Sequence, residues 1–343
     1  MKVAIRADAS TNLGSGHVMR CLTLADALRE RGAEIRFVCR KLPGHMCDLI
    51  TKKGYGLVWL SKYSSLAEDA RDSYAALTDQ APWDWLVVDH YMLDAVWERE
   101  LRAITDKLMV IDDLANRSYD CDLLLDQNLQ EPGRYDGLIP ETSAMLIGPK
   151  YALLRPQFAA ARENLRVRDG RVSRLLVFFG GADADGETLK ALSAIKMLGR
   201  PDIVIDVVLG QTNPHRQEIE AACRDLPNVA LHCQVENMAE LMAAADLFVG
   251  AGGTSSWERC CLGIPALSTA IADNQTAVCL ALAKSGVVKY LGESTQTSVD
   301  SWCNGLNACI QDDWLVGASQ RARELVDGLG AQRVVKAIWE VSA

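Results

Sequence analysis

The sequence predicts an α/β protein with two domains, each built around a parallel sheet. The chain has 343 residues, which exceeds the size at which one hydrophobic core usually stops growing. Short apolar runs that end in small or polar residues alternate with longer segments of helical spacing, which is typical of β-α-β units. We expect domains at 1–155 and 175–330, a connection at 156–174, and a C-terminal helix at 331–343 that can cross back onto the first domain.

In the first half, a clear amphipathic helix follows the first strand. It runs from Val18 to Arg31 with one apolar stripe, and Gly32 ends it. Similar helical segments fill the spaces between the apolar runs. These runs are the expected strands 3–6, 34–39, 56–60, 86–89, 108–111 and 123–125.

The second half begins after an arginine-rich stretch that contains Gly170. We interpret this stretch as the connection between the domains; the alternative is a solvated, charged helix and loop within one domain. After it the alternation starts again. The expected strands are 175–179, 204–209, 229–232, 247–250, 266–269 and 288–291.

The composition is that of a soluble globular protein, and it excludes several classes of partner. Apolar residues make up 49% and charged residues 24% of the chain. The net charge of −9 argues against a nucleic-acid-binding face, which would be basic. There is no run of about 18 apolar residues, and the first residues have the pattern of a strand rather than of a signal peptide. We therefore expect a cytoplasmic protein with no nucleic-acid partner and no stable membrane insertion.

The sequence predicts neither a metal site nor a cofactor. The eleven cysteines are scattered without the spacing of a zinc site, so we expect reduced, mostly buried thiols. Gly14 and Gly16 begin a dinucleotide-like fingerprint, but position 19 is Met where the third glycine would be needed. A phosphate-bearing ligand would then be held by helix N-termini and glycine turns.

The end of the first expected strand carries a candidate site. It leads through polar and small residues into the next helix: Arg6, Asp8, Asn12, Gly14, Gly16 and His17. Ligands of open α/β sheets bind at the carboxyl ends of the strands. The dipole of the helix disfavours the protonated form of His17, which suits this side chain to accept a proton near neutral pH. The alternative is an exposed histidine without a role.

Further polar residues follow the fourth and fifth expected strands. Asp89, His90 and Tyr91 come at the end of the fourth strand. Asp89 could orient His90, or it could cap the helix that opens around Asp94. The two aspartates at 112–113 offer a third set of carboxylates, or they simply form a cap or a turn.

In the second half, glycine turns directly follow two strands. Such turns direct backbone N–H groups toward an anion, so a diphosphate could be held without a metal or a lysine. Glu258 could accept hydrogen bonds from ribose hydroxyls, or it could merely complement a helix dipole. The candidate nucleotide-binding residues are Gly180, Gly181, Gly252, Gly253, Thr254, Ser255, Glu258, Asn274 and Gln275.

These motifs resemble two related groups of proteins. The run from Gly250 through Glu258 to Gln275 resembles the UDP-binding half of the MurG-type glycosyltransferases, which have the GT-B architecture. The first half resembles, more narrowly, the UDP-2,4-diacetamido-2,4,6-trideoxy-β-L-altropyranose hydrolases of pseudaminic acid biosynthesis. The matching motifs there are Arg6-Ala-Asp-Ala-Ser10, Gly14-Ser-Gly-His17-Val-Met-Arg20 and Val88-Asp-His-Tyr91.

The resemblance implies a GT-B-like fold, with two Rossmann-like parallel-sheet domains facing a cleft, and a hydrolase activity. Water would cleave the anomeric C–O bond with inversion, releasing UDP and the free sugar. The implied catalytic residues are His17, Tyr91 and Asp8. The implied substrate-binding residues of the first half are Arg6, Asn12, Gly14, Gly16, Arg20 and Asp89. A UDP-sugar and UDP would be the ligands, and we expect a monomer or a weak dimer.

Three other functions remain open on the sequence. A glycosyltransferase would bind UDP in the same way and use an acceptor hydroxyl in place of water. A nucleotide-sugar pyrophosphatase would attack phosphorus, usually with metals held by clustered acids, which the sequence lacks. A silent sensor would bind the nucleotide sugar without turnover.

Overall fold

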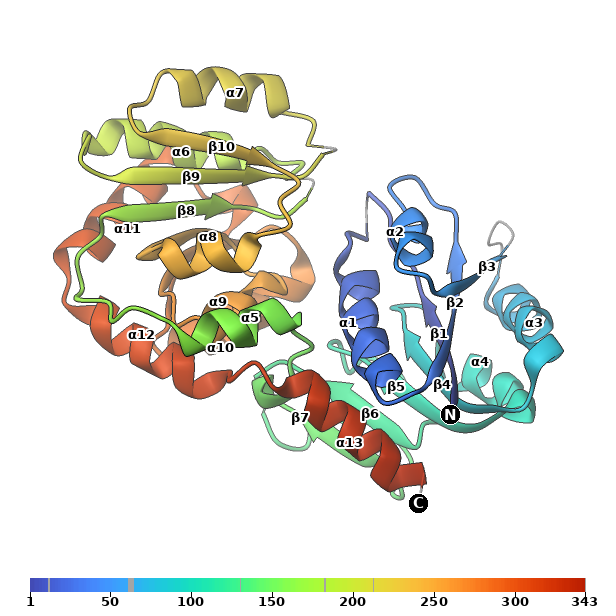
Figure 1. The fold of residues 1–343 in the computed structure, drawn as a ribbon. Coiled ribbons are helices and arrows are strands. Elements are labelled where there is room, and N and C mark those ends of the chain that lie inside the picture. Colours follow the sequence, from blue (N-terminus) through green and yellow to red (C-terminus); the bar gives the residue numbers. More distant parts are fainter. Residues whose placement is uncertain (12, 61–64, 130, 182, 212, 343) are drawn as a thin grey trace. The chain divides into compact units, whose positions relative to one another are not determined.

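The chain folds into two compact units (Figure 1). A computed structural model describes residues 1–11, 13–60, 65–129, 131–181, 183–211 and 213–342. The first unit comprises Met1–Leu153 and Leu329–Ala343, and the second comprises Leu154–Gly328.

The arginine-rich stretch 156–174, which we expected to connect the domains, lies within the second unit. It begins with α5 (Pro156–Glu163), whose Phe158 is fully buried. Arg162 and Arg168 donate hydrogen bonds to backbone carbonyl oxygens of the second unit, Arg162 to Cys261 at 2.6 Å. These hydrogen bonds attach the stretch to the second unit, whereas the guanidinium groups of a linker would be solvated.

Among the described residues, the first unit contains a seven-stranded parallel sheet in the order β3-β2-β1-β4-β5-β6-β7 (Figure 1). Six strands lie where the sequence predicts them. The seventh, β7, was not expected, because only Leu146 of its four residues is buried. The strands are β1 (Lys2–Ala7), β2 (Glu34–Arg40), β3 (Gly56–Leu60), β4 (Trp83–Asp89), β5 (Thr105–Ile111), β6 (Leu123–Asp126) and β7 (Ala144–Ile147).

Helices cover both faces of this sheet, and alternate strand residues supply the two cores. Val3 and Ile5 of β1 pack in the core with α1, α2 and α13, whereas Ala4 packs in the core with α3 and α4. The C-terminal α13 contributes Val334 and Ile338 to the first of these cores. The helices are α1 (Gly16–Glu30), α2 (Cys47–Lys52), α3 (Leu66–Leu77), α4 (Ala95–Leu101) and α13 (Gly330–Ser342), with short 3-10 turns at Thr78–Gln80, Arg102–Ile104 and Pro149–Tyr151.

The second unit contains a parallel sheet of six described strands in the order β10-β9-β8-β11-β12-β13 (Figure 1). One face packs against α6, α7 and α11, and α8 and α9 contact the strands from the other side. The strands are β8 (Arg174–Phe178), β9 (Val204–Leu209), β10 (Val229–Cys233), β11 (Leu247–Ala251), β12 (Ala266–Ala270) and β13 (Val288–Glu293). The remaining helices are α6 (Glu187–Leu198), α7 (Arg216–Arg224), α8 (Met238–Ala244), α9 (Ser255–Cys261), α10 (Asp273–Lys284), α11 (Val299–Gln311) and α12 (Trp314–Leu325), with a 3-10 turn at Ser294–Gln296.

In both sheets the strand order reverses beside the first strand of the unit. The reversal falls between β1 and β4 in the first sheet and between β8 and β11 in the second. Connections leave to opposite faces at such a point, and ligands of open α/β sheets bind there, at the carboxyl ends of the strands. Most candidate residues of both halves lie at the ends of these four strands or in the turns and helices that follow them, whereas Asn274 and Gln275 follow β12. None of the helices in the described part of the chain is long and apolar enough to span a membrane.

Candidate active site

His17 is held by Asp89 at the strand reversal of the first unit. His17 is the second residue of α1, and Asp89 is the last residue of β4. Its ring Nδ1 lies 2.6 Å from Asp89 Oδ1, and the exposed fractions are 6% for His17 and 0% for Asp89. Because the carboxylate accepts a hydrogen bond at Nδ1, we assign the ring proton to Nδ1, which leaves the lone pair on Nε2. A histidine oriented in this way can take a proton from a water molecule or a ligand.

Strand alternation explains why Asp89 contacts His17. Val87 of β4 belongs to the core beneath α1, and Val88 belongs to the core on the opposite face. Side chains alternate along a strand, so Asp89 points to the α1 face and His90 to the other. His90 Nε2 accordingly lies 3.4 Å from Asp8 Oδ2.

Neither role that we considered for Asp89 is correct. Its carboxylate orients His17 and not His90. It does not cap α4 either, because Asp94 does so by accepting hydrogen bonds from the backbone N–H groups of Val96 and Trp97. The sequence motif alone could not reveal which ring faces Asp89.

Arg20 and Tyr91 surround the His17 ring together with Asp113. Arg20 donates to both carboxylate oxygens of Asp89 at 2.6 Å, and its Nη1 lies 3.5 Å from Asp113 Oδ2. The Tyr91 ring packs edge-on against His17 at a centroid distance of 4.5 Å, and its hydroxyl donates to Asp113 Oδ2 at 3.4 Å. Asp113 Oδ1 is buried without a partner among the described residues, so it could accept a hydrogen bond from a ligand.

The charges beneath His17 are fixed. Burial opposes the ionisation of Asp89, but Arg20 and His17 outweigh it and hold the pKa of this carboxyl well below its usual range. Burial also disfavours charged Arg20, yet Asp89 outweighs it and raises the pKa of the guanidinium above its ordinary value. Both groups stay ionised near neutral pH. Arg20, which the resemblance implies as a substrate-binding residue, is therefore engaged in positioning the carboxylate.

Arg6 and Asp8 belong to a second buried network. Arg6 donates to Asp8 at 2.8 Å and to Asp69 at 2.9 Å, and the backbone N–H of Arg40 donates to Asp8 at 2.7 Å. Arg6 is 1% and Asp8 2% exposed, so neither presents a free surface to a ligand. These contacts make Asp8 a support for the strand ends and for His90.

The connection between β1 and α1 leaves the start of α1 open. Gly14 has a φ of 76°, which favours glycine, and its N–H donates to the Ser10 carbonyl at 2.8 Å. Gly16 begins α1, and the side chain of the N-cap residue Ser15 makes no capping hydrogen bond. Asn12, which we expected to bind substrate, lies outside the described residues.

The turn after β8 brings Gly180 and Gly181 to the carboxyl edge of the second sheet. Gly180 has a φ of 88°, and beyond the neighbours of Gly181 in the chain no heavy atom of the described residues lies within 4 Å of the position that a Cβ would take at Gly181. Gly210, which follows β9, packs so closely that its Cβ would fall 2.0 Å from the Gly181 carbonyl oxygen. Close packing therefore requires a glycine at position 210, whereas the space beside Gly181 could receive a ligand.

The turn between β11 and α9 has the same two features. A Cβ on Gly252 would fall 2.0 Å from Cys279 Sγ, whereas the nearest neighbour of a Cβ on Gly253 is Gln275 Nε2 at 3.5 Å. Thr254 is exposed, and the adjacent Ser255 is 9% exposed. The turn therefore packs against Cys279 at Gly252, whereas Gly253 leaves space for a ligand and Thr254 is exposed to solvent.

Glu258 follows this turn and is anchored by Arg155, which the sequence did not predict as a residue of the site. Glu258 Oε1 accepts a hydrogen bond from Arg155 Nη2 at 3.2 Å, and its side chain is 20% exposed. Burial raises the pKa of Glu258, and Arg155 opposes this rise. Gln275 Oε1 accepts from the Ile271 N–H at 3.1 Å, and Asn274 is exposed at the start of α10.

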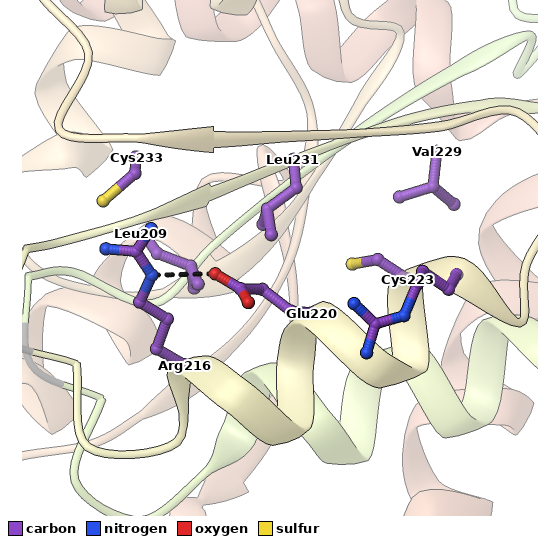
Figure 2. Close-up of a pocket in the computed structure, with 8 residues that line it drawn as sticks. Leu209, Arg216, Glu220, Cys223, Val229, Leu231 and Cys233 are labelled. Atoms are coloured by element: carbon purple, nitrogen blue, oxygen red, sulfur yellow. Dashed lines mark hydrogen bonds and ion pairs between the residues drawn. The ribbon is translucent and has the colours of Figure 1, made fainter.

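A cavity of about 450 Å³ in the second unit lies between α7 and strands β9 and β10 (Figure 2). Arg216 Nε donates to Glu220 Oε1 there at 2.8 Å. None of the residues predicted for the site lines this cavity. Its lining consists of Leu209, Arg216, Glu220, Cys223, Arg224, Val229, Leu231 and Cys233. Within the described ranges, no group of three or more His, Cys, Asp or Glu side chains could hold a metal ion.

No protein-family model matches the chain. The chain is similar to the UDP-2,4-diacetamido-2,4,6-trideoxy-beta-L-altropyranose hydrolase of Campylobacter jejuni, at 26% identity over 83% of this chain and 97% of that protein. It is also similar to the spore coat polysaccharide biosynthesis protein SpsG of Bacillus subtilis, at 25% identity over 99% and 98% of the two chains. An uncharacterized protein of Methanocaldococcus jannaschii is 26% identical, and the chain spans only 54% of its length.

Solved structures share the fold at lower identity. MurG of Acinetobacter baumannii matches with a TM-score of 0.71 at 16% identity, over 99% of both chains. The spinosyn rhamnosyltransferase SpnG matches with a TM-score of 0.67 at 16% identity, over 98% of this chain and 100% of that one. The predicted fold class of two Rossmann-like parallel-sheet domains, as in GT-B proteins, is confirmed. The resemblance seen in the motifs is confirmed as well, since the chain is similar in sequence to the curated hydrolase over most of its length and has the fold of MurG.

Proposed function

We propose that the chain is a nucleotide-sugar hydrolase that cleaves a UDP-linked 2,4-diacetamido-2,4,6-trideoxyhexose at its anomeric C–O bond. The observation that carries the proposal is the contact of 2.6 Å between His17 Nδ1 and the fully buried Asp89, which prepares a base at the end of a parallel sheet. The name of the Campylobacter relative supports the substrate class. A place in the synthesis of pseudaminic acid is what the resemblance of the sequence motifs implies. The open glycine turns of the second unit support the binding of UDP.

In this proposal His17 Nε2 removes a proton from water, and the water oxygen forms a bond to the anomeric carbon. The bond between that carbon and the UDP oxygen breaks, and its electron pair leaves with UDP. A single displacement inverts the configuration. Asp89 stabilises the imidazolium that forms, and the N–H groups near Gly253 stabilise the charge on the leaving diphosphate.

Tyr91 and Asp113 would hold the sugar. Tyr91 fixes one side of the His17 ring, and Asp113 keeps one carboxylate oxygen free of partners among the described residues. A carboxylate oxygen can accept from a sugar hydroxyl or from an acetamido N–H. In the second unit, Glu258 would accept from the ribose hydroxyls while Arg155 orients it.

Two experiments test the proposal. Turnover in water labelled with oxygen-18 should place the label in the free sugar, whereas label in a nucleotide phosphate would mean attack at phosphorus. The His17→Leu variant should lose turnover and still bind UDP, because the glycine turns lie in the other unit. A variant that keeps most of its rate would refute the assignment of the base.

A glycosyltransferase that uses a UDP-sugar donor is the second candidate. The fold that the chain shares with MurG and with a rhamnosyltransferase supports it. The two functions differ in the reaction without an acceptor. A hydrolase releases UDP at its full rate from the nucleotide sugar and water alone, whereas a transferase releases it slowly until an acceptor alcohol is added.

A further inference from the structure

Arg259 is a fully buried cation for which the described residues provide no acceptor. It lies in α9, one helical turn after the start of that helix, and its exposed fraction is 0%. Its Nε, Nη1 and Nη2 atoms are all buried without a hydrogen-bond partner in the described part of the chain. Its guanidinium carbon lies 6.0 Å from the centroid of the apolar Phe248 ring.

The other buried arginines that can be compared in the described residues have acceptors for their guanidinium groups, although Arg6 Nε also lacks one. Arg6 pairs with Asp8, and Arg20 makes two hydrogen bonds of 2.6 Å with Asp89. Arg168, which is also in the second unit, donates to the backbone carbonyls of Ala245, Leu262 and Gly263 at 2.8 to 3.1 Å. A buried charge without a partner is strongly unfavourable. Arg259 is therefore an exception that calls for an external anion.

The ionisable neighbours of Arg259 do not supply a counter-charge. Burial lowers the pKa of Arg259, and the groups that act against this are the thiols of Cys260 and Cys279. Burial raises the pKa of both thiols, to about 11 for Cys279. Near neutral pH both thiols are protonated and uncharged, so neither of them compensates the positive charge of the guanidinium.

The neighbours of this charge also place it near the end of β11 and the turn that follows it. The Phe248 Cε1 atom lies 2.6 Å from the position of a Cβ on Gly250. Cys279 Sγ lies 2.0 Å from the position of a Cβ on Gly252. Phe248 and Cys279, which both interact with the guanidinium, thus lie against Gly250 in β11 and Gly252 in the turn that follows this strand.

We propose that Arg259 is the fixed positive charge that makes this turn select nucleoside diphosphates over nucleosides. The inference rests on the proposed function, which assigns UDP to the turn. Arg259 does not reach the surface, so it acts as a positioning residue, through the field that it creates at the backbone N–H groups above it. In an interior of low dielectric constant, a charge acts over several ångströms on a phosphate. The bound phosphates in turn compensate the buried charge.

Titration calorimetry of the full chain with UDP, UMP and uridine tests this. The wild type should bind UDP more tightly than uridine. Arg259→Met should raise the Kd for UDP roughly tenfold to a hundredfold and leave the Kd for uridine within about twofold, since a nucleoside lacks the charge that Arg259 attracts. Arg259→Lys, which keeps the charge on a shorter side chain, should recover part of the preference for UDP. Without nucleotide, Arg259→Met should melt no lower than the wild type, because an uncompensated charge has been removed.

Arg168→Met is the matched control. It removes a buried guanidinium from the same unit and leaves carbonyl groups without donors, so it should lower the melting temperature and keep the ratio of the UDP and uridine affinities. Equal losses of UDP and uridine affinity in Arg259→Met would overturn the inference and leave the proposed function standing. A wild-type protein that binds no UDP would overturn the proposed function itself, and this inference with it.

Discussion

Replacing Asp89 by Asn is the most direct test of the proposed base. The carboxylate is fully buried, lies 2.6 Å from His17 Nδ1 and accepts two hydrogen bonds of 2.6 Å from Arg20. Asparagine has the same shape, but it removes the negative charge. Its amide group must also present N–H donors to a histidine nitrogen or a guanidinium that itself donates, so one of these contacts becomes repulsive.

Two losses follow, and they can be estimated separately. Removing one partner of a buried ion pair costs about 3 to 5 kcal/mol of stability, because Arg20 remains charged and buried. The imidazolium that forms during the reaction also loses its counter-ion and its tautomer control. In Ser-His-Asp enzymes the equivalent change lowers kcat by about 10⁴. We expect Asp89→Asn to lower kcat by roughly 10³ to 10⁴, which corresponds to about 4 to 5.5 kcal/mol.

The assay must separate catalysis from stability, and the chain offers a matched control. Asp8 is equally buried in the same unit and pairs with Arg6, but its histidine contact is with His90. Asp8→Asn should lower the melting temperature about as much as Asp89→Asn does and should lower kcat by less than about tenfold. UDP release, measured below the melting temperature of both variants, gives kcat. Equal losses of kcat in the two variants would refute the assignment of Asp89 to the base.

Three further predictions follow from single contacts. Burial raises the pKa of Glu98 from 4.5 to about 7, so its ionisation removes stability as the pH rises through 7, by roughly 3 kcal/mol at 1.36 kcal/mol per pKa unit. Glu98→Gln should therefore melt above the wild type at pH 8 and lose that advantage toward pH 5; parallel melting curves would contradict this. Gly181→Val should weaken UDP binding at least about tenfold in calorimetry without lowering the melting temperature, because the Cβ position there is open; an unchanged Kd would exclude this turn from the site. Tyr91→Phe keeps the ring against His17 and removes the hydroxyl group, which donates a long hydrogen bond of 3.4 Å to Asp113. It should cost less than about tenfold in kcat, and Tyr91→Ala should cost clearly more; equal effects would mean that the ring does not position His17.

The fold was predictable because parallel strands leave a strong local signal. Buried strands appear as short apolar runs, and twelve of the strands in the two sheets lie where these runs predict them. β7 escaped notice because it is short and mostly unburied. The stretch 156–174 looked like a linker because its arginines suggest solvent, but these side chains find backbone carbonyls as acceptors. Those carbonyls are distant in sequence, and composition carries no information about them.

The sequence predicted where the site lies, but it did not predict which side chains contact one another there. The rule that ligands bind at the carboxyl ends of parallel strands brings His17, Asp89 and Tyr91 together. Which side chain Asp89 contacts depends on the face of the sheet to which it points. Side chains alternate along β4, so a shift of one residue would turn Asp89 away from His17 and toward the face on which His90 lies. Asp69 lies 63 residues from Arg6, and Arg155 lies 103 residues from Glu258. These pairs meet only in the folded chain, so no local sequence motif predicts them.

In both units, buried charged groups that have a partner differ from those that lack one. The paired groups hold other side chains in place, and the unpaired groups are candidates for contact with a ligand. Asp89 and Arg20 compensate each other, so they can hold His17 in place without titrating near neutral pH. Arg259 has no such partner in the described residues, and neither has one carboxylate oxygen of Asp113. Such groups cost stability in the free protein, because replacing an unpaired buried charge by an apolar side chain is favourable. A ligand would compensate them, with phosphate groups near the cation and sugar hydroxyl or amide groups at the carboxylate. On this reasoning the free protein should gain more stability from UDP than from uridine, and Arg259→Met should abolish that difference.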